Sequence, residues 1–343
     1  MKKLICFVAA CLILALVSCS QTVKNEPEGA GRVKNSSAVT ETAGPDGTDK
    51  ATGTAPSADP APTGYASFSG SSAAGDLVYV RADGEKVSDF SFLDGKSREY
   101  VPDCGDPDTG SWYCGKTERD PETGEVRKIW DRSDETLGLL AKYGVIYRGD
   151  ESRNVCYFTF DCDYEYGGNV AKILDTLKDK GVKALFVLNG TIIESRPDLV
   201  KRMIDEGHTV GNHGRNHKNM ARLSVDEFIK EVEDNNALLR EKIPGAPYMV
   251  WYRPPYGTVT EWDMALAERM GLKNALYSWT YDDYHDDAQP EPASAKEAIL
   301  KGLHPGCVYM FHPKSTTDAA VMGEVIDAIR AAGYEIESVE NIK

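Results

Sequence analysis

His213 and His217 stand four positions apart, a spacing that places both imidazoles on one side of a helical turn. Imidazole is a common zinc ligand, and this spacing recurs in zinc sites. A histidine pair alone is weak support, because such pairs also occur on surfaces that bind no metal. The pair becomes a candidate metal site when the fold is expected to bring acidic residues beside it.

Other chemically useful residues follow short apolar segments, each with the length of a buried strand. Carboxylates, imidazoles and a guanidinium gathered at one place have the chemistry to activate water and to protonate a leaving group. Whether they gather depends on the fold. The polar residues at the ends of these segments are Asp161-Cys162-Asp163, Asn212 to His217, Arg253, Asp282-Asp283-Tyr284 and His312.

The apolar segments alternate with amphipathic segments of helical periodicity. One helix, 228–242, follows a capping box from Ser224 to Glu227, and another, 196–206, has a proline in its first turn. This alternation indicates parallel strands with helical crossovers. We predict an α/β fold, a distorted (β/α)-barrel of about seven strands, with its chemistry at the C-terminal ends of the strands. The predicted strands are 156–160, 184–188, 209–211, 249–253, 274–277, 307–311 and 334–336, and further helices are predicted at 170–179 and 318–332.

Residues 1–19 have the pattern of an export signal. Two lysines precede a fourteen-residue apolar run that is short for a membrane span. The run ends in Leu16-Val17-Ser18-Cys19, which resembles the lipobox of bacterial lipoproteins. The resemblance implies a lipid on Cys19 and an extracytoplasmic protein anchored to a membrane of the cell envelope. The alternative is an ordinary cleaved signal peptide with an incidental cysteine.

Residues 20–65 are rich in Ala, Thr, Gly, Pro and Ser and poor in large apolar side chains, so we predict a disordered linker. For residues 66–135 we predict a small β-rich extension, with a strand at 77–80. Cys104 and Cys114 flank a turn in this extension, where an exported protein is expected to form a local disulfide. The net charge of −15 argues against a nucleic-acid partner. We expect a monomer.

The polar strand ends resemble, in order, five motifs of the polysaccharide deacetylases, which carry the NodB homology domain of carbohydrate esterase family 4. The resemblance covers residues 136–343. The segments 142–150 and 159–175 are similar to the delta-lactam-forming subgroup, which acts on N-acetylmuramic acid. The matching motifs are Thr159-Phe160-Asp161, His213-x-x-x-His217, Arg253-Pro254-Pro255-Tyr256-Gly257, Asp283-Tyr284 and Met310-Phe311-His312.

The resemblance implies a metal-dependent hydrolase that removes N-acetyl groups from peptidoglycan, with N-acetylmuramic acid as the favoured sugar and Zn²⁺ as the expected ion. By this resemblance Asp161 is the general base and Arg253 holds it ionised. His312 is the general acid and Asp283 orients it. The Tyr256 backbone N–H is expected to complete an oxyanion hole, and the remaining substrate contacts are assigned to Pro255 and Tyr284.

The chain departs from the family pattern where a second, metal-binding aspartate is expected. Cys162 stands there, and its thiolate would complete a His-His-Cys zinc site, unless the side chain points into the core. Asp163 is the alternative source of a carboxylate. Because of this departure, a non-catalytic wall-binding lipoprotein on the same fold stays an alternative. A chitin- or xylan-type deacetylase is a third interpretation, which differs only in its substrate. The presence of Asp161, Arg253 and His312 together favours an enzyme.

Overall fold

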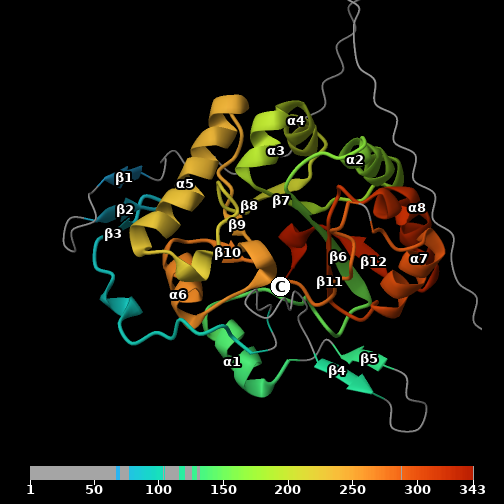
Figure 1. Ribbon diagram of the computed structural model, residues 1–343, viewed down its shortest axis with the longest axis horizontal. Helices are drawn as coiled ribbons and strands as arrows, with labels where there is room; N and C mark the ends of the chain where they lie inside the picture. The colour runs from blue at the N-terminus through green and yellow to red at the C-terminus, as the bar shows by residue number, and fades with distance from the viewer. Residues whose placement is uncertain are drawn as a thin grey trace, which may run out of the picture. The chain divides into compact units, whose positions relative to one another are not determined.

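The predicted strands form one curled, parallel sheet in the computed structural model (Figure 1). Neighbouring strands follow the order β10-β9-β8-β7-β6-β11, and β12 pairs with the first half of β6. The predicted α/β barrel of about seven strands is therefore confirmed. Its strands are β6 (Val155–Cys162), β7 (Leu185–Leu188), β8 (Thr209–Asn212), β9 (Trp251–Tyr252), β10 (Lys273–Asn274), β11 (Cys307–Phe311) and β12 (Glu335–Glu337).

The structure describes residues 67–69, 77–102, 104, 116–119, 126–129, 132–286 and 288–342. The predicted export signal at 1–19 and nearly all of the linker and extension that join it to residue 77 lie outside this part of the chain. Cys114 lies outside it as well, so its disulfide with Cys104 stays a prediction. Among the described helices, none is both long enough and apolar enough to cross a membrane.

The side chains of β6 alternate between two environments, as the period of a strand requires. Those at even positions pack outward among the helices α2, α4 and α8, in one large apolar cluster. Those at odd positions face the inside of the barrel, where Val155 and Tyr157 contact residues of β7, β9 and β11. Asp161 occupies an odd position, so its carboxylate faces inward at the C-terminal end of the strand.

The helices cover the outer face of the sheet (Figure 1). Their ends follow the predicted signals: Ser224 and Glu227 form the expected capping box, and Pro197 is the first residue of α4. The helices are α1 (Asp134–Lys142), α2 (Asn169–Lys180), α3 (Gly190–Ser195), α4 (Pro197–Asp205), α5 (Val225–Lys242), α6 (Glu261–Arg269), α7 (Pro292–Lys301) and α8 (Thr316–Ala331), with short 3₁₀ turns η1 (Ser91–Leu93), η2 (Met220–Arg222), η3 (Pro255–Gly257) and η4 (Val339–Asn341).

The segment 273–280 closes the barrel by pairing first with one edge of the sheet and then with the other. Lys273 N donates to Val250 O at 2.8 Å, on the β9 side. Ser278 N then donates to Val308 O at 3.0 Å, on the β11 side. Because the segment changes partners midway, it cannot keep a regular ladder. For this reason β10 is shorter than the predicted strand at 274–277.

The N-terminal extension contributes side chains to the main fold. Strands β1 (Ser67–Ser69), β2 (Val78–Val80) and β3 (Lys86–Val87) form an antiparallel sheet, and β4 (Lys116–Arg119) pairs with β5 (Val126–Ile129). Tyr79 is fully buried in the apolar cluster that includes Phe228 of α5 and Trp262 of α6. Its hydroxyl donates to Glu233 Oε1 at 3.0 Å. The boundary between residues 135 and 136 stays a prediction.

Replacing Tyr79 should therefore destabilise the whole domain. We expect Tyr79→Ala to lower the free energy of unfolding by about 3–5 kcal/mol, because it empties a buried aromatic site. Tyr166→Ala is the matched control, since Tyr166 is 41% exposed, and it should change stability by no more than about 0.5 kcal/mol. Urea unfolding followed by circular dichroism measures both. Equal, small effects would mean that the extension packs independently of the barrel.

Candidate active site

A buried ion pair lies at the C-terminal end of β6. Arg253 Nη1 donates to Asp161 Oδ1 at 2.5 Å, and neither side chain is appreciably exposed. Burial alone would raise the pKa of Asp161, but the Arg253 guanidinium, together with the nearby imidazoles of His213 and His312, outweighs burial and holds that pKa below its usual value. Asp161 is therefore a carboxylate at neutral pH, in the state that a proton acceptor requires.

The remaining donors of Arg253 fix the guanidinium in place. Its Nε donates to Ala275 O at 2.7 Å, and its Nη2 donates to Thr159 Oγ1 at 2.8 Å and to Leu276 O at 3.1 Å. These partners come from β6 and from the segment that closes the barrel. The orientation of Asp161 thus follows from the closure of the sheet.

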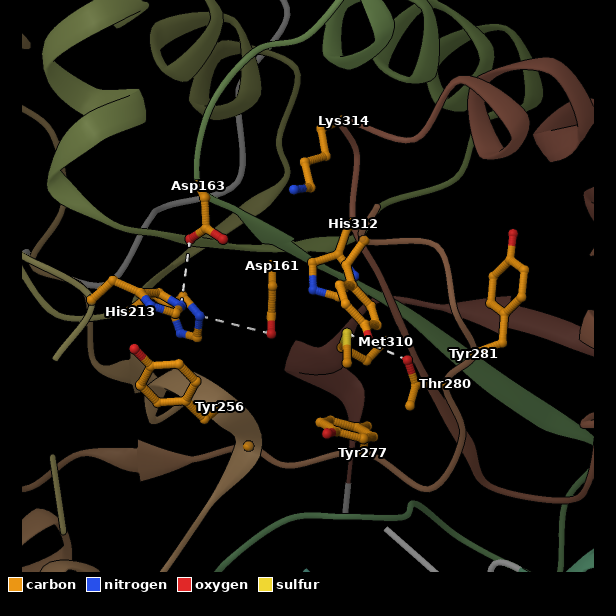
Figure 2. Close-up of a pocket in the computed structure, with 13 residues that line it drawn as sticks. Asp161, Asp163, His213, Tyr256, Tyr277, Thr280, Tyr281, Met310, His312 and Lys314 are labelled. Carbon is orange, nitrogen blue, oxygen red and sulfur yellow. Dashed lines mark hydrogen bonds and ion pairs between the residues drawn. The ribbon is translucent and has the colours of Figure 1, made fainter. Parts of the chain in front are cut away.

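His213, His217 and Asp163 place their ligand atoms within 4.8 Å of one another. Figure 2 shows His213 and Asp163 on the side of the cavity next to Asp161. The Nδ1 atom of His213 lies 2.8 Å from Arg253 O, and because a carbonyl oxygen only accepts, Nδ1 carries the proton. The Nε2 lone pair of His213 is then directed into the cavity. The donor set of two imidazoles and one carboxylate fits a divalent metal.

The two histidines do not lie on a helix, so that part of the sequence prediction is wrong. His213 directly follows β8, and His217 sits in the loop beyond it with a left-handed backbone, φ 53°. Glu231 of α5 holds this loop by accepting hydrogen bonds from Asn216 N and Asn216 Nδ2, both at 2.8 Å. A tertiary contact therefore produces the geometry that a helical turn was expected to give.

Asp163 is oriented by Asn189, at the end of the neighbouring strand β7. Asn189 Nδ2 donates to Asp163 Oδ1 at 2.8 Å, while Asn189 Oδ1 accepts from Thr191 N and caps α3. Sequence reasoning missed Asn189 and Glu231. The only local signal for Asn189 is its position after a buried strand and before a helix, which is typical of an N-cap.

The structure does not bring Cys162 into the site. Its side chain is 0% exposed and packs in the outer apolar cluster with Phe160, on the face of β6 opposite Asp161. Burial also raises the pKa of its thiol well above the usual value, away from the thiolate that binds metal. The prediction that Cys162 is a ligand is corrected accordingly, and Asp163, one position further on, is the candidate ligand instead.

His312 and Asp283 form a second hydrogen-bonded pair on the other side of the cavity, in which Asp283 is fully buried and His312 is partly exposed. Asp283 Oδ1 accepts from His312 Nδ1 at 2.7 Å, and Oδ2 accepts from the His312 backbone N at 2.7 Å. Burial alone would lower the pKa of His312, but the Asp283 carboxylate, together with the nearby Asp161 and Asp163, outweighs burial and the pKa of His312 is raised. His312 is therefore set to carry a proton on Nε2.

Between these groups lies a cavity of about 270 Å³. Tyr256 and Tyr284 line it, as expected, whereas Pro255 is buried in the η3 turn and does not. Lys314, which sequence reasoning did not select, supplies an ammonium group to its wall (Figure 2). The lining residues are Asp161, Asp163, His213, His217, Tyr256, Gly257, Tyr277, Thr280, Tyr281, Tyr284, Met310, His312 and Lys314.

Known proteins are similar to this chain in sequence and in fold. Over 212 residues the chain is 30% identical to the peptidoglycan-N-acetylmuramic acid deacetylase PdaA of Bacillus subtilis, covering 62% of this chain and 80% of PdaA. It is 31% identical to a peptidoglycan-N-acetylglucosamine deacetylase of Bacillus cereus, and that match covers 56% of this chain and 71% of the B. cereus protein. The solved structure of B. subtilis PdaA, a family 4 carbohydrate esterase, matches with a TM-score of 0.60 and 27% identity over 66% of this chain and 94% of that one.

Residues 148–275 match the sequence profile of polysaccharide deacetylases. This range contains the Asp161–Arg253 pair and the three candidate metal ligands. The chain belongs to the polysaccharide deacetylase family.

Proposed function

We propose that the protein is a zinc-dependent N-deacetylase of peptidoglycan, acting on N-acetylmuramic acid. The observation that carries this proposal is that Asp161, paired with Arg253, and His312, paired with Asp283, line one cavity. A protein that only binds a polysaccharide has no use for a base and an acid held in these pairs. Sequence similarity to PdaA supports the substrate.

Each residue then has a defined task in hydrolysis of the acetamide. Asp161 accepts a proton from the attacking water, since its partner Arg253 keeps it ionised. His312 gives its Nε2 proton to the nitrogen as the C–N bond breaks, and Asp283 balances the charge of the imidazolium. A divalent cation held by Asp163, His213 and His217 would lower the pKa of water and polarise the acetyl carbonyl. We assign the Tyr256 backbone N–H to the developing oxyanion.

Lys314 supports the choice of sugar. N-acetylmuramic acid differs from N-acetylglucosamine by a lactyl ether that bears a carboxylate. The walls of the cavity hold the anionic Asp161 and Asp163, which would repel such a group, and Lys314 is the ammonium among the lining residues. Its Nζ lies 2.7 Å from Tyr164 Oη and 3.4 Å from Asp286 Oδ1, at the rim of the cavity.

We further propose that the protein works outside the cytoplasm, as a monomer tethered by a lipid on Cys19. The substrate is a wall polymer that does not diffuse, so an anchored enzyme on a flexible linker would reach it through the motion of its tether. The lipobox-like residues 16–19 and the composition of 20–65 support this arrangement.

The function is tested by acetate release from purified peptidoglycan, using the chain without residues 1–19 and with Zn²⁺ restored after chelation. Asp161→Asn should lower kcat by a factor of about 10²–10⁴, because the base is lost while the fold is kept. Asp175→Asn, on the exposed face of α2, is the matched control. No acetate from a folded, zinc-loaded wild type would favour the wall-binding alternative, and acetate from chitin or xylan alone would change the substrate.

Zinc affinity distinguishes the two candidate ligands of the first motif. Removing a residue that only hydrogen-bonds to a metal ligand typically weakens metal binding about 10–100-fold. Asp163 is proposed as a ligand itself, so Asp163→Ala should raise the Kd for Zn²⁺ by at least about 10-fold. Cys162→Ala should leave the Kd unchanged, because the thiol lies in the core. Competition with a chromophoric chelator measures both values. A raised Kd in Cys162→Ala alone would restore the cysteine as the ligand.

Substrate selectivity tests Lys314. Lys314→Met should lower kcat/KM for a muramic-acid glycan with a free lactyl carboxylate by about 10–100-fold, the weight of one charge-assisted hydrogen bond. Hydrolysis of a chito-oligosaccharide should be unaffected. Lys296→Met, on α7, controls for the loss of a partly buried lysine that pairs with a carboxylate, since Lys296 Nζ lies 2.7 Å from Glu324 Oε2. Equal losses on both substrates would mean that Lys314 only supports the loop around Tyr164.

A further inference from the structure

Behind the His312–Asp283 pair lies a second carboxyl group, Asp318, which takes no part in the chemistry described above. It stands in the first turn of α8 and is 0% exposed. The hydroxyl of Tyr281 donates to its Oδ1, and its backbone N donates to Ser315 Oγ at 3.0 Å. Within the described part of the chain no donor reaches its Oδ2.

Besides Tyr281, the side chain within hydrogen-bonding reach of Asp318 is Asp283, which is itself an acceptor. Both oxygens of Asp283 already receive hydrogen bonds from His312. No lysine or arginine of residues 132–286 or 288–342 forms an ion pair with Asp318. The titratable groups that face it are Tyr281 and Asp283, with His312 beyond Asp283.

Two carboxyl groups in contact and away from water are not both ionised, because they repel each other and the one positive group beside them, the imidazole of His312, contacts Asp283 alone. Asp283 faces a protonated imidazole and therefore takes the negative charge. Asp318 keeps its proton, in agreement with the effect of burial and of the Asp283 charge, which together raise the pKa of Asp318 well above its usual value. A protonated carboxyl group has an O–H to donate, which supplies the missing partner of Oδ2.

We propose that Asp318 is a positioning residue, which stays protonated and donates a hydrogen bond from Oδ2 to Asp283, so that a single negative charge faces the catalytic acid His312. Because it assigns His312 as the acid, this inference rests on the proposed function. The chain Tyr281–Asp318–Asp283–His312 links α8 to the loop after the barrel-closing segment. Ser315 and Gln289 connect the same elements, since Ser315 Oγ donates to Gln289 Oε1 at 2.6 Å and Gln289 Nε2 donates to Asp283 O at 3.0 Å.

The neutral state of Asp318 has a consequence for catalysis. A second negative charge beside Asp283 would stabilise the imidazolium further and make His312 a weaker acid. A neutral donor instead fixes the rotamer of Asp283 and draws part of its charge away from the imidazole. His312 then keeps a pKa above its usual value and is still able to release its proton.

The test is the pH profile of kcat/KM, whose alkaline limb follows His312: activity is lost as the pH rises through its pKa and the proton is removed. Asp318→Asn keeps an acceptor for Tyr281 and a donor for Asp283 and is neutral, so the limb should stay at the wild-type pH. If Asp318 were an anion, the same substitution would remove a negative charge and move the limb to lower pH, which would overturn the proposal.

Asp318→Leu has a similar shape but no donor. It should lower kcat by about 10-fold, since a buried hydrogen bond to a charged group is lost, with KM little changed. The limb should move to higher pH, because Asp283 keeps its full charge beside His312. Wild-type kcat and an unmoved limb in Asp318→Leu would deny Asp318 any positioning role.

Infrared difference spectroscopy gives a readout that needs neither activity nor the leucine variant. At neutral pH, far above the ordinary aspartate pKa of about 3.9, the wild type should show the C=O stretch of a protonated carboxylic acid that is missing in Asp318→Asn and present in Asp161→Asn. Absence of this band from the wild type would refute the inference. If the band is present but no acetate is ever released, the proposed function alone fails.

Discussion

The ion pair between Arg253 and Asp161 is the interaction on which the rest of the site depends. Removing a charge from water costs on the order of several kcal/mol per ion, so a buried pair adds little to the stability of the fold. Its presence is better explained by a functional constraint. Arg253 acts through both its side chain and its backbone. Its side chain binds Asp161, Thr159 and the barrel-closing segment, while its own carbonyl oxygen accepts the Nδ1 proton of His213. The base and a metal ligand are thus oriented by one residue.

This arrangement also explains an irregular part of the barrel. The carbonyl groups of Ala275 and Leu276 accept from the Arg253 guanidinium, so the chain around them is engaged by a side chain as well as by neighbouring strands. The segment then moves from β9 to β11 within a few residues and continues into the loop that holds Asp283. A regular strand here would pair these carbonyl groups in a ladder, and the guanidinium would then keep Asp161 and Thr159 but lose its two backbone partners. Barrel closure and the preparation of both acid–base residues are therefore coupled.

Much of the fold and of the site was predictable, because its principal residues lie directly at the ends of buried strands. The strand β11 has the predicted bounds, and Asp161, Arg253, His213 and His312 all face inward from strand ends as expected. The error at Cys162 was avoidable, since side chains alternate along a strand. An inward Asp161 requires an outward Cys162 beside Phe160, and the next inward position is Asp163. Asn189, Glu231 and Asp318 were beyond prediction, because each acts through a contact between elements that leaves no local pattern.

Each carboxyl group around the cavity is either paired with a positive group or neutral, with the exception of Asp163. Asp161 is compensated by Arg253, and Asp283 by the protonated His312, while Asp318 remains neutral. Asp163 receives a hydrogen bond from the uncharged amide of Asn189 and lies 3.9 Å from His217, whose pKa is lowered by burial and by the nearby His213. A neutral imidazole does not balance a carboxylate, but it does offer a lone pair. The same residues that leave Asp163 without a compensating charge are therefore those that would hold a divalent cation beside it, and such an ion would supply the positive charge that Asp163 lacks.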